Sequence, residues 1–231
     1  MMQHDDATLA PGAPGGPTTP APSAAEAAYT ATKAAILDGD FPAGSMLSEG
    51  DVATRLGISR TPVREAFLRL QVEGWLRLYP KRGALVVPPE PGEARDVLEA
   101  RVLVETSGVR AASASQDHAD ELAGAMHRRL DEQRTAHATD DLSAFAEHDL
   151  AFHRAIVEAG GNALLLGFQD SLADHERRMS TRSLWRRKDS SQLVLAQHAG
   201  LIEAVELRDP ALFEERLREH LSTVHRRLLE P

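Results

Sequence analysis

Four residues in the C-terminal half of the chain have the types and the spacing of metal ligands. Asp149 and His153 lie four positions apart in a helical stretch, so both side chains leave the same face and can share one ion. His198 and His220 fall in two later helical stretches, each on or beside an apolar stripe. If all four converge, the set suits a divalent ion such as zinc or nickel, with a position open for water or a ligand oxygen. The alternative is a pair of partly buried histidines satisfied by hydrogen bonds.

A different chemistry is indicated by residues 58–70, which read ISRTPVREAFLRL. Four apolar side chains recur there with the spacing of a buried helical stripe: Val63, Ala66, Phe67 and Leu70. With that stripe packed inward, Arg60, Thr61 and Arg64 project outward near the N-terminus of the helix. Arginine in this position on a recognition helix can bind guanine O6 and N7 or a phosphate. For an isolated helix, a solvated charged face would be the simpler interpretation.

The elements around this stretch favour the nucleic-acid interpretation. An Ala-rich helix is predicted from Ala24 to about Leu37, and a second helix begins at Ser48 and ends at Gly57. Ser59 can cap a third helix that has Pro62 in its first turn. Residues 76–87, LRLYPKRGALVV, alternate apolar and polar on both sides of a turn and predict a hairpin. Three helices followed by a basic hairpin indicate a winged helix-turn-helix.

The rest of the chain is predicted to be helical. Six helices are expected, at about 93–114, 117–138, 140–159, 162–180, 190–207 and 210–229, and strand signals are absent. We therefore expect a mainly α protein in three parts. Residues 1–23 form a disordered tail, residues 24–89 form the winged helix-turn-helix, and residues 93–231 form an all-α bundle. The segment PPEPGE at residues 88–93 is a stiff linker.

Charge separates the two predicted domains. The chain carries a net charge of −9, yet residues 55–82 hold seven basic and two acidic residues, whereas residues 91–231 hold 18 basic and 25 acidic residues. A basic block beside an acidic body indicates two modules with different partners. The absence of cysteine excludes disulfides and thiolate metal sites. We expect a cytoplasmic protein with no membrane partner, because no apolar run is long enough to span a bilayer and residues 1–23 do not resemble a signal peptide.

Residues 24–89 resemble the DNA-binding domain of GntR-family bacterial transcription regulators. The family core SRTPVREAL stands here as SRTPVREAF at residues 59–67, after a lead-in that contains Gly39, Pro42, Leu47 and Glu49. The resemblance implies DNA contacts from the recognition helix, with support from the second helix and the wing: Arg55, Ser59, Arg60, Thr61, Arg64, Lys81, Arg82 and Gly83. One departure is Gly50, a position that is basic in some relatives.

Residues 93–229 resemble the FCD ligand domain of the FadR subfamily, and six helices fit its shorter, VanR-like form. The family patterns fall on Asp149, His153, His198 and His220, the positions that bind metal in many members, and on Gly161–Asn162. The resemblance also implies that Arg101, in the family's Glu-x-Arg position, meets an effector carboxylate beside the metal, and that Asn162 belongs to the effector site. From the residues alone, Arg101 shares a helix face with apolar neighbours, so an internal salt bridge to a glutamate is the alternative.

Together these features predict an effector-responsive transcription regulator, a repressor that binds operator DNA as a homodimer. A small organic acid bound at a divalent metal is expected to modulate DNA binding. Two alternatives stay open: a metal-dependent enzyme that activates water, and a DNA-binding protein with a purely structural metal. No separate general base or nucleophile motif supports the enzyme.

Overall fold

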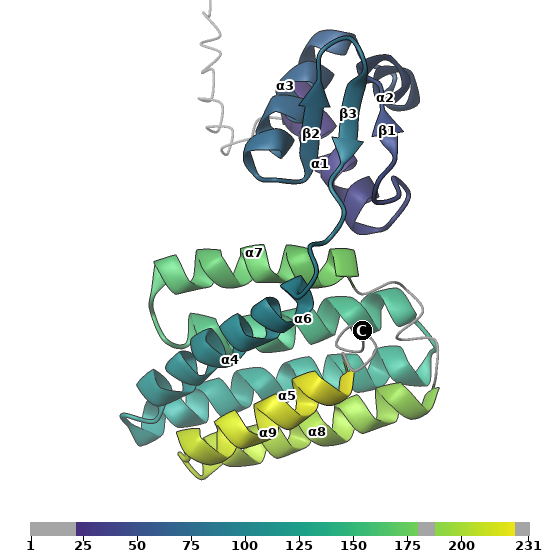
Figure 1. The fold of residues 1–231 in the computed structure, drawn as a ribbon. Coiled ribbons are helices and arrows are strands. Elements are labelled where there is room, and N and C mark those ends of the chain that lie inside the picture. Colours follow the sequence, from purple (N-terminus) through teal and green to yellow (C-terminus); the bar gives the residue numbers. More distant parts are fainter. Residues whose placement is uncertain (1–21, 180–187, 225–231) are drawn as a thin grey trace, which may run out of the picture.

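The protein consists of a small mixed domain joined to a helical bundle (Figure 1). The computed structural model describes residues 22–179 and 188–224, so the predicted disordered tail lies almost entirely outside the described residues. The small domain contains α1 (Ala24–Leu37), α2 (Glu49–Leu56) and α3 (Arg60–Val72), together with a three-stranded sheet. This arrangement confirms the predicted winged helix-turn-helix.

Local signals in the sequence set the bounds of the first helices. The hydroxyl of Ser23 accepts a hydrogen bond from the amide of Glu26 at the start of α1, and that of Ser48 accepts one from Asp51 at the start of α2. Gly57 ends α2 with a φ of 68°, a left-handed conformation that glycine adopts without strain. Ser59 is the residue before α3 as predicted, but its side chain makes no capping hydrogen bond. The prediction of a Ser59 cap was therefore correct only in position.

The sheet of the small domain contains a strand that the sequence did not predict. Strands β1 (Met46–Leu47), β2 (Leu76–Tyr79) and β3 (Gly83–Val86) pair antiparallel in the order β1-β3-β2. Gly83 has a φ of 99°, and a Cβ at this position would lie 2.3 Å from the carbonyl oxygen of Leu47. Only glycine fits where β3 passes this close to β1. The wing glycine therefore has a structural role in the sheet.

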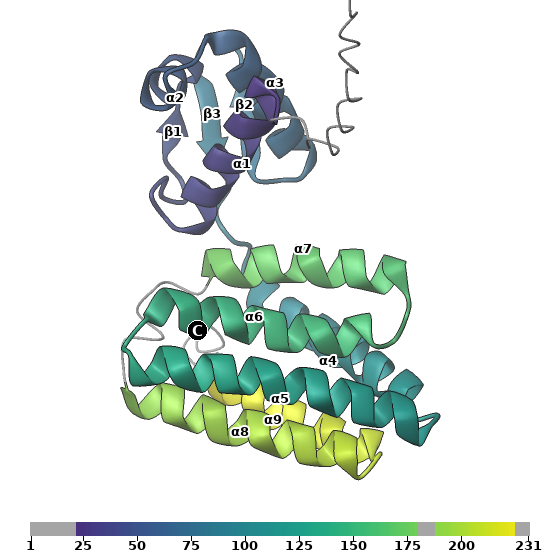
Figure 2. The same ribbon diagram turned by 180° about the vertical axis from the view of Figure 1, so that it is seen from behind.

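The described residues of the bundle form six helices, as predicted: α4 (Glu93–Ala112), α5 (Gln116–Ala138), α6 (Leu142–Glu158), α7 (Ala163–Met179), α8 (Lys188–Glu206) and α9 (Pro210–Val224). The predicted helix ends at residues 180 and 229 lie outside the described residues. Seen from behind, α5, α6 and α8 lie side by side, with α4 and α9 on their far side (Figure 2). Helix α7 lies along the edge of the bundle that faces the small domain. None of the helices in the described ranges is long and apolar enough to cross a membrane.

The bundle core brings together helices that are far apart in the sequence. Its buried side chains come from five of the six helices and include Val109, Met126, Leu130, Phe152, Leu201 and Phe213. Helix α4 approaches α6 closely because Gly108 has no side chain. A Cβ on Gly108 would lie 2.1 Å from the carbonyl oxygen of Ile156. This contact fixes the spacing between the α4 residues and the α6 residues that face each other inside the bundle.

We predict that Gly108→Ala lowers the free energy of unfolding by about 1–3 kcal/mol, because the added methyl forces α4 away from α6. Gly124→Ala is the matched control, since a Cβ there would meet only the flexible end of Arg128 at 3.7 Å. That change should be neutral or stabilise the protein by up to about 1 kcal/mol. Urea unfolding followed by circular dichroism measures both variants. Equal stability of the two variants would contradict the close packing of α4 on α6.

Candidate functional site

Three histidines from separate helices meet inside the bundle. His153 on α6, His198 on α8 and His220 on α9 are each at least 98% buried. Their ring centroids lie 4.8–5.2 Å apart, and one ligand atom from each lies within 4.8 Å of the other two. The structure thus brings together three of the four residues predicted to bind a metal.

Hydrogen bonds at the opposite ring nitrogen orient each imidazole. Nδ1 of His153 lies 2.7 Å from Oε2 of Glu105, that of His198 lies 2.9 Å from Oε1 of Gln133, and that of His220 lies 3.1 Å from Oε1 of Gln197. Because each partner atom is an oxygen acceptor, each Nδ1 donates its hydrogen. An imidazole that is neutral and donates from Nδ1 has its lone pair on Nε2, the state in which histidine binds metals.

Two of these Nε2 atoms are buried without a hydrogen-bond partner. Within the described part of the chain, the Nε2 atoms of His153 and His198 find no such partner. A buried polar atom left in this way costs about 1–3 kcal/mol. Burial also lowers the pKa of His198 well below its usual value, so the ring is neutral at physiological pH. Both observations fit a divalent cation between the three rings.

Asp149 lies beside this cluster. Its Oδ1 accepts a hydrogen bond from Nε2 of Gln133 at 3.1 Å and lies 3.5 Å from Nε2 of His198. Its carboxylate is not a member of the group whose ligand atoms all lie within 4.8 Å of one another. Burial raises the pKa of Asp149 above its usual value. The role of Asp149 as a fourth ligand stays a prediction.

Arg101 is buried next to the cluster and pairs with two carboxylates. Its Nε donates to Oε1 of Glu105 at 2.9 Å, and its Nη1 donates to Oε2 of Glu176 at 2.7 Å. Burial raises the pKa of Glu105, but His153 and Arg101 outweigh that effect and hold it below the usual value. The guanidinium is thus connected to the His153 ring through Glu105. This is the internal salt bridge that sequence reasoning named as the alternative for Arg101.

Sequence reasoning missed four residues of this site: Glu105, Gln133, Glu176 and Gln197. Gln133 had a readable signal, because it follows Met126 and Leu130 on the buried stripe of α5 and is fully buried itself. Asn162 was predicted to join the effector site, but its Oδ1 caps α7 by accepting from the amides of Leu164 and Leu165. Asn162 itself is exposed, and its place in the effector site stays a prediction.

A second candidate site lies on the small domain. The side chains of Arg60, Thr61 and Arg64 at the start of α3 are exposed, as are those of Lys81 and Arg82 at the wing turn. Among the described residues, none of these four basic side chains forms an ion pair, so their charge is available to a polyanion. Ser59 and Gly83 were also predicted to contact DNA. Ser59 is the exposed residue before α3, and Gly83 is the wing glycine that lets β3 pass close to β1.

Arg55 and Arg69 of the small domain are already engaged. Arg55 pairs with Asp40 at 3.0 Å, and Arg69 pairs with Glu26 at 2.8 Å. Gly50 leaves room for the Arg60 side chain, since a Cβ at Gly50 would lie 3.1 Å from its Nη2. Among the described residues, exposed positive charge without an ion pair thus lies at the N-terminus of α3, at the wing tip and on Arg77 of β2. The first two are the parts that a winged helix-turn-helix places on DNA.

Comparison with known proteins identifies the class. Residues 24–86 match the family described as bacterial regulatory proteins, gntR family, and residues 96–223 match the FCD domain. The chain therefore belongs to the GntR family of bacterial regulatory proteins and carries an FCD domain. Both families and the relatives below are transcription regulators, which confirms the predicted regulator and sets the enzyme alternative aside.

Relatives match over most of their length. The chain is 29% identical over 196 residues to an HTH-type transcriptional regulator in an unstable DNA locus of Streptomyces ambofaciens, covering 85% of this chain and 81% of that one. It is 27% identical over 184 residues to the HTH-type transcriptional repressor RspR of Escherichia coli K12, covering 78% of both. A GntR-type regulator from Rhodococcus sp. RHA1 has the same fold, with a TM-score of 0.71, 22% identity, and coverage of 89% of this chain and 97% of that one.

We predict that His198→Ala abolishes stoichiometric binding of zinc or nickel, because it removes one of three imidazole ligands. Gln133→Ala should weaken metal binding about 10–100-fold, since Gln133 holds the His198 ring in its metal-binding tautomer. His127→Ala is the control, because His127 is exposed and pairs with Glu206 away from the cluster. Isothermal titration with elemental analysis measures all three. Stoichiometric metal in His198→Ala would show that the ion binds elsewhere.

Proposed function

We propose that this regulator is a homodimeric repressor whose operator binding is controlled by a small organic acid bound at a divalent metal in the bundle. The observation that supports the metal most directly is the pair of buried Nε2 atoms of His153 and His198, with His220 beside them. Three imidazoles suit zinc or nickel and leave further positions open for Asp149 or an added ligand. When bound, the ion supplies a positive charge that attracts carboxylate oxygens.

Arg101 supports an acidic effector. Its guanidinium is buried, is connected to His153 through Glu105 and already binds carboxylates, so this site recognises that group by charge and by forked hydrogen bonds. A metal with a purely structural role would need no buried arginine beside it. The chemistry of the site thus favours a small carboxylate over a neutral sugar or a cation.

The DNA-binding role rests on the exposed, unpaired residues of α3 and the wing. Arg60, Thr61 and Arg64 would enter the major groove, while Lys81 and Arg82 would contact the phosphate backbone or the adjacent groove. One recognition helix reads only a few base pairs, so we propose a two-fold dimer on a palindromic site. Three exposed apolar residues on the adjacent helices α4 and α7 can contact a second copy: Leu103, Leu164 and Phe168.

Arg60→Ala and Arg64→Ala should each cost about 1–3 kcal/mol of operator binding per half-site, and both half-sites of a dimer would lose it. An operator selected from random DNA and titrated by fluorescence anisotropy measures the loss. Arg129→Ala on α5, which removes an exposed arginine far from the wing, should bind as tightly as the wild type. Wild-type binding by both α3 variants would exclude this face. Light scattering of the complex should find two chains per operator, and one chain would contradict the dimer.

Arg101→Lys tests the effector site. Lysine keeps a positive charge against Glu105 and Glu176 but loses the forked donor, whereas alanine would remove the buried positive charge between these two carboxylates at a cost of about 3–5 kcal/mol. The variant should keep one metal ion per chain and lose the response of operator binding to acetate, lactate and succinate. In the wild type, at least one of these acids should weaken operator binding. A wild type that binds metal and responds to none of them would favour a structural metal.

A further inference from the structure

The last described turn of α7 contacts both the bundle interior and the small domain. Glu176 points into the bundle and pairs with Arg101 at 2.7 Å. Two neighbours point to the small domain: Asp174 pairs with Lys33 at 2.7 Å and Arg177 pairs with Asp38 at 2.8 Å. Among residues 173–178, Glu176 alone is buried. The end of this helix is therefore held to the bundle by an ion pair inside the candidate effector site.

The same turn also contacts the segment that connects the two domains. The guanidinium of Arg178 lies 4.8 Å from the ring centroid of Trp75, and the His175 ring lies 5.0 Å from it. Arg178 also donates to the carbonyl of Val87 and to the carboxylate of Glu93, the first residue of α4. Any displacement of this turn must therefore disturb the contacts of the small domain and its linker together.

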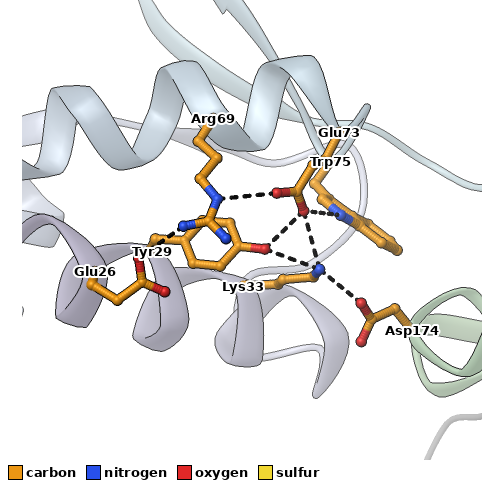
Figure 3. A network of polar contacts seen from close by, with 7 residues as sticks. All are labelled: Glu26, Tyr29, Lys33, Arg69, Glu73, Trp75 and Asp174. Atoms are coloured by element: carbon orange, nitrogen blue, oxygen red, sulfur yellow. Dashed lines mark hydrogen bonds and ion pairs between the residues drawn. The ribbon is translucent and has the colours of Figure 1, made fainter. Parts of the chain in front are cut away.

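On the small domain, these contacts lead to the end of the recognition helix (Figure 3). Lys33 binds Asp174 on one side and Glu73 at 3.0 Å on the other, and Glu73 is the C-cap residue of α3. The hydroxyl of Tyr29 and the indole of Trp75 also donate to Glu73, at 2.9 Å and 3.2 Å. Burial lowers the pKa of Lys33, but its bonds to Asp174, Tyr29 and Glu73 outweigh this and raise it, so Lys33 stays charged.

In the bundle, Glu176 occupies the place that an acidic ligand of Arg101 requires. An added carboxylate would be the third around one buried positive charge, which is costly where water is excluded. Glu105 is fully buried and holds Nδ1 of His153, so its displacement would also disturb the histidine cluster. Glu176 is the one buried residue among residues 173–178, so its displacement would release the last described turn of α7 from the bundle.

We propose that Glu176 is a built-in carboxylate ligand of Arg101 that an acidic effector displaces, and that residues 174–178 transmit this displacement to the recognition helix through Asp174 and Lys33. This inference rests on the proposed function of the same pocket and adds its mechanism of regulation. An effector acts on DNA binding only through its different affinities for the two arrangements of the protein. Replacement of the Glu176 carboxylate by the effector carboxylate at Arg101 provides that difference in affinity.

The test uses three variants of the full chain and the selected operator, without effector. Glu176→Gln removes the charge that holds α7 to Arg101, so it should imitate the effector and weaken operator binding about fivefold or more. Asp174→Asn weakens the contact with Lys33 on the half-exposed side and should have a similar effect. Asp170→Asn is the matched control on α7, because Asp170 is exposed and pairs with Arg154 on α6. Its operator binding should equal that of the wild type.

The double variant decides whether Glu176 and Asp174 act on one equilibrium. If they do, Glu176→Gln combined with Asp174→Asn should bind operator no more weakly than the weaker single variant. The acid that acts on the wild type should act on Glu176→Gln at about tenfold lower concentration, since no carboxylate competes with it. Wild-type operator binding by Glu176→Gln, with unchanged thermal melting, would overturn the proposal, as would simple addition of the two effects.

Metal content separates this proposal from the proposed function. The wild type and all four variants should hold the same amount of zinc by elemental analysis, because neither Glu176 nor Asp174 belongs to the histidine cluster. If none of them binds metal, the proposed metal site fails, while the operator comparison still decides the coupling. If no carboxylate acts on the wild type or on Glu176→Gln, the effector assignment and the displacement step fail together.

Discussion

A buried chain of hydrogen bonds and ion pairs connects the histidine cluster to the edge of the bundle. It runs from His153 through Glu105 and Arg101 to Glu176, with distances of 2.7, 2.9 and 2.7 Å. Each member depends on its neighbours, because a buried charge without a partner costs several kcal/mol. The chain exists because Gly108 allows α4, which carries Arg101 and Glu105, to approach α6, which carries His153. The orientation of the His153 ring and the position of α7 therefore both depend on the close contact of Gly108 with α6.

The two domains divide their charges differently. In the small domain, Arg55 and Arg69 are paired within the domain, whereas Arg60 and Arg64 at the start of α3 are left for a partner. In the bundle, the charges beside the histidine cluster are buried and paired with one another. The proposed function uses both arrangements, since DNA would bind the exposed cations and an acidic effector would exchange with a buried carboxylate.

Much of this architecture was predictable because the signals are local. Helix caps, the buried stripe of α3 and the alternation of the hairpin depend on neighbouring residues, and they placed the helices within a few residues of their bounds. Strand β1 was missed because two residues carry no alternation. The sequence alone places the histidines on or beside apolar stripes, but it does not identify the glutamates that pair with Arg101. Which of many glutamates reaches it depends on how α4 and α7 pack, and Glu105 and Glu176 lie 4 and 75 positions away.

In the proposed function, the Nε2 atoms of His153, His198 and His220 form one metal site next to Arg101. X-ray absorption at the zinc edge of the zinc-loaded protein measures this site directly, because scattering from imidazole rings is distinctive. We expect three imidazole nitrogens at about 2.0–2.1 Å and oxygen in the remaining coordination. A spectrum with oxygen ligands only, or with fewer than three imidazoles, would contradict it.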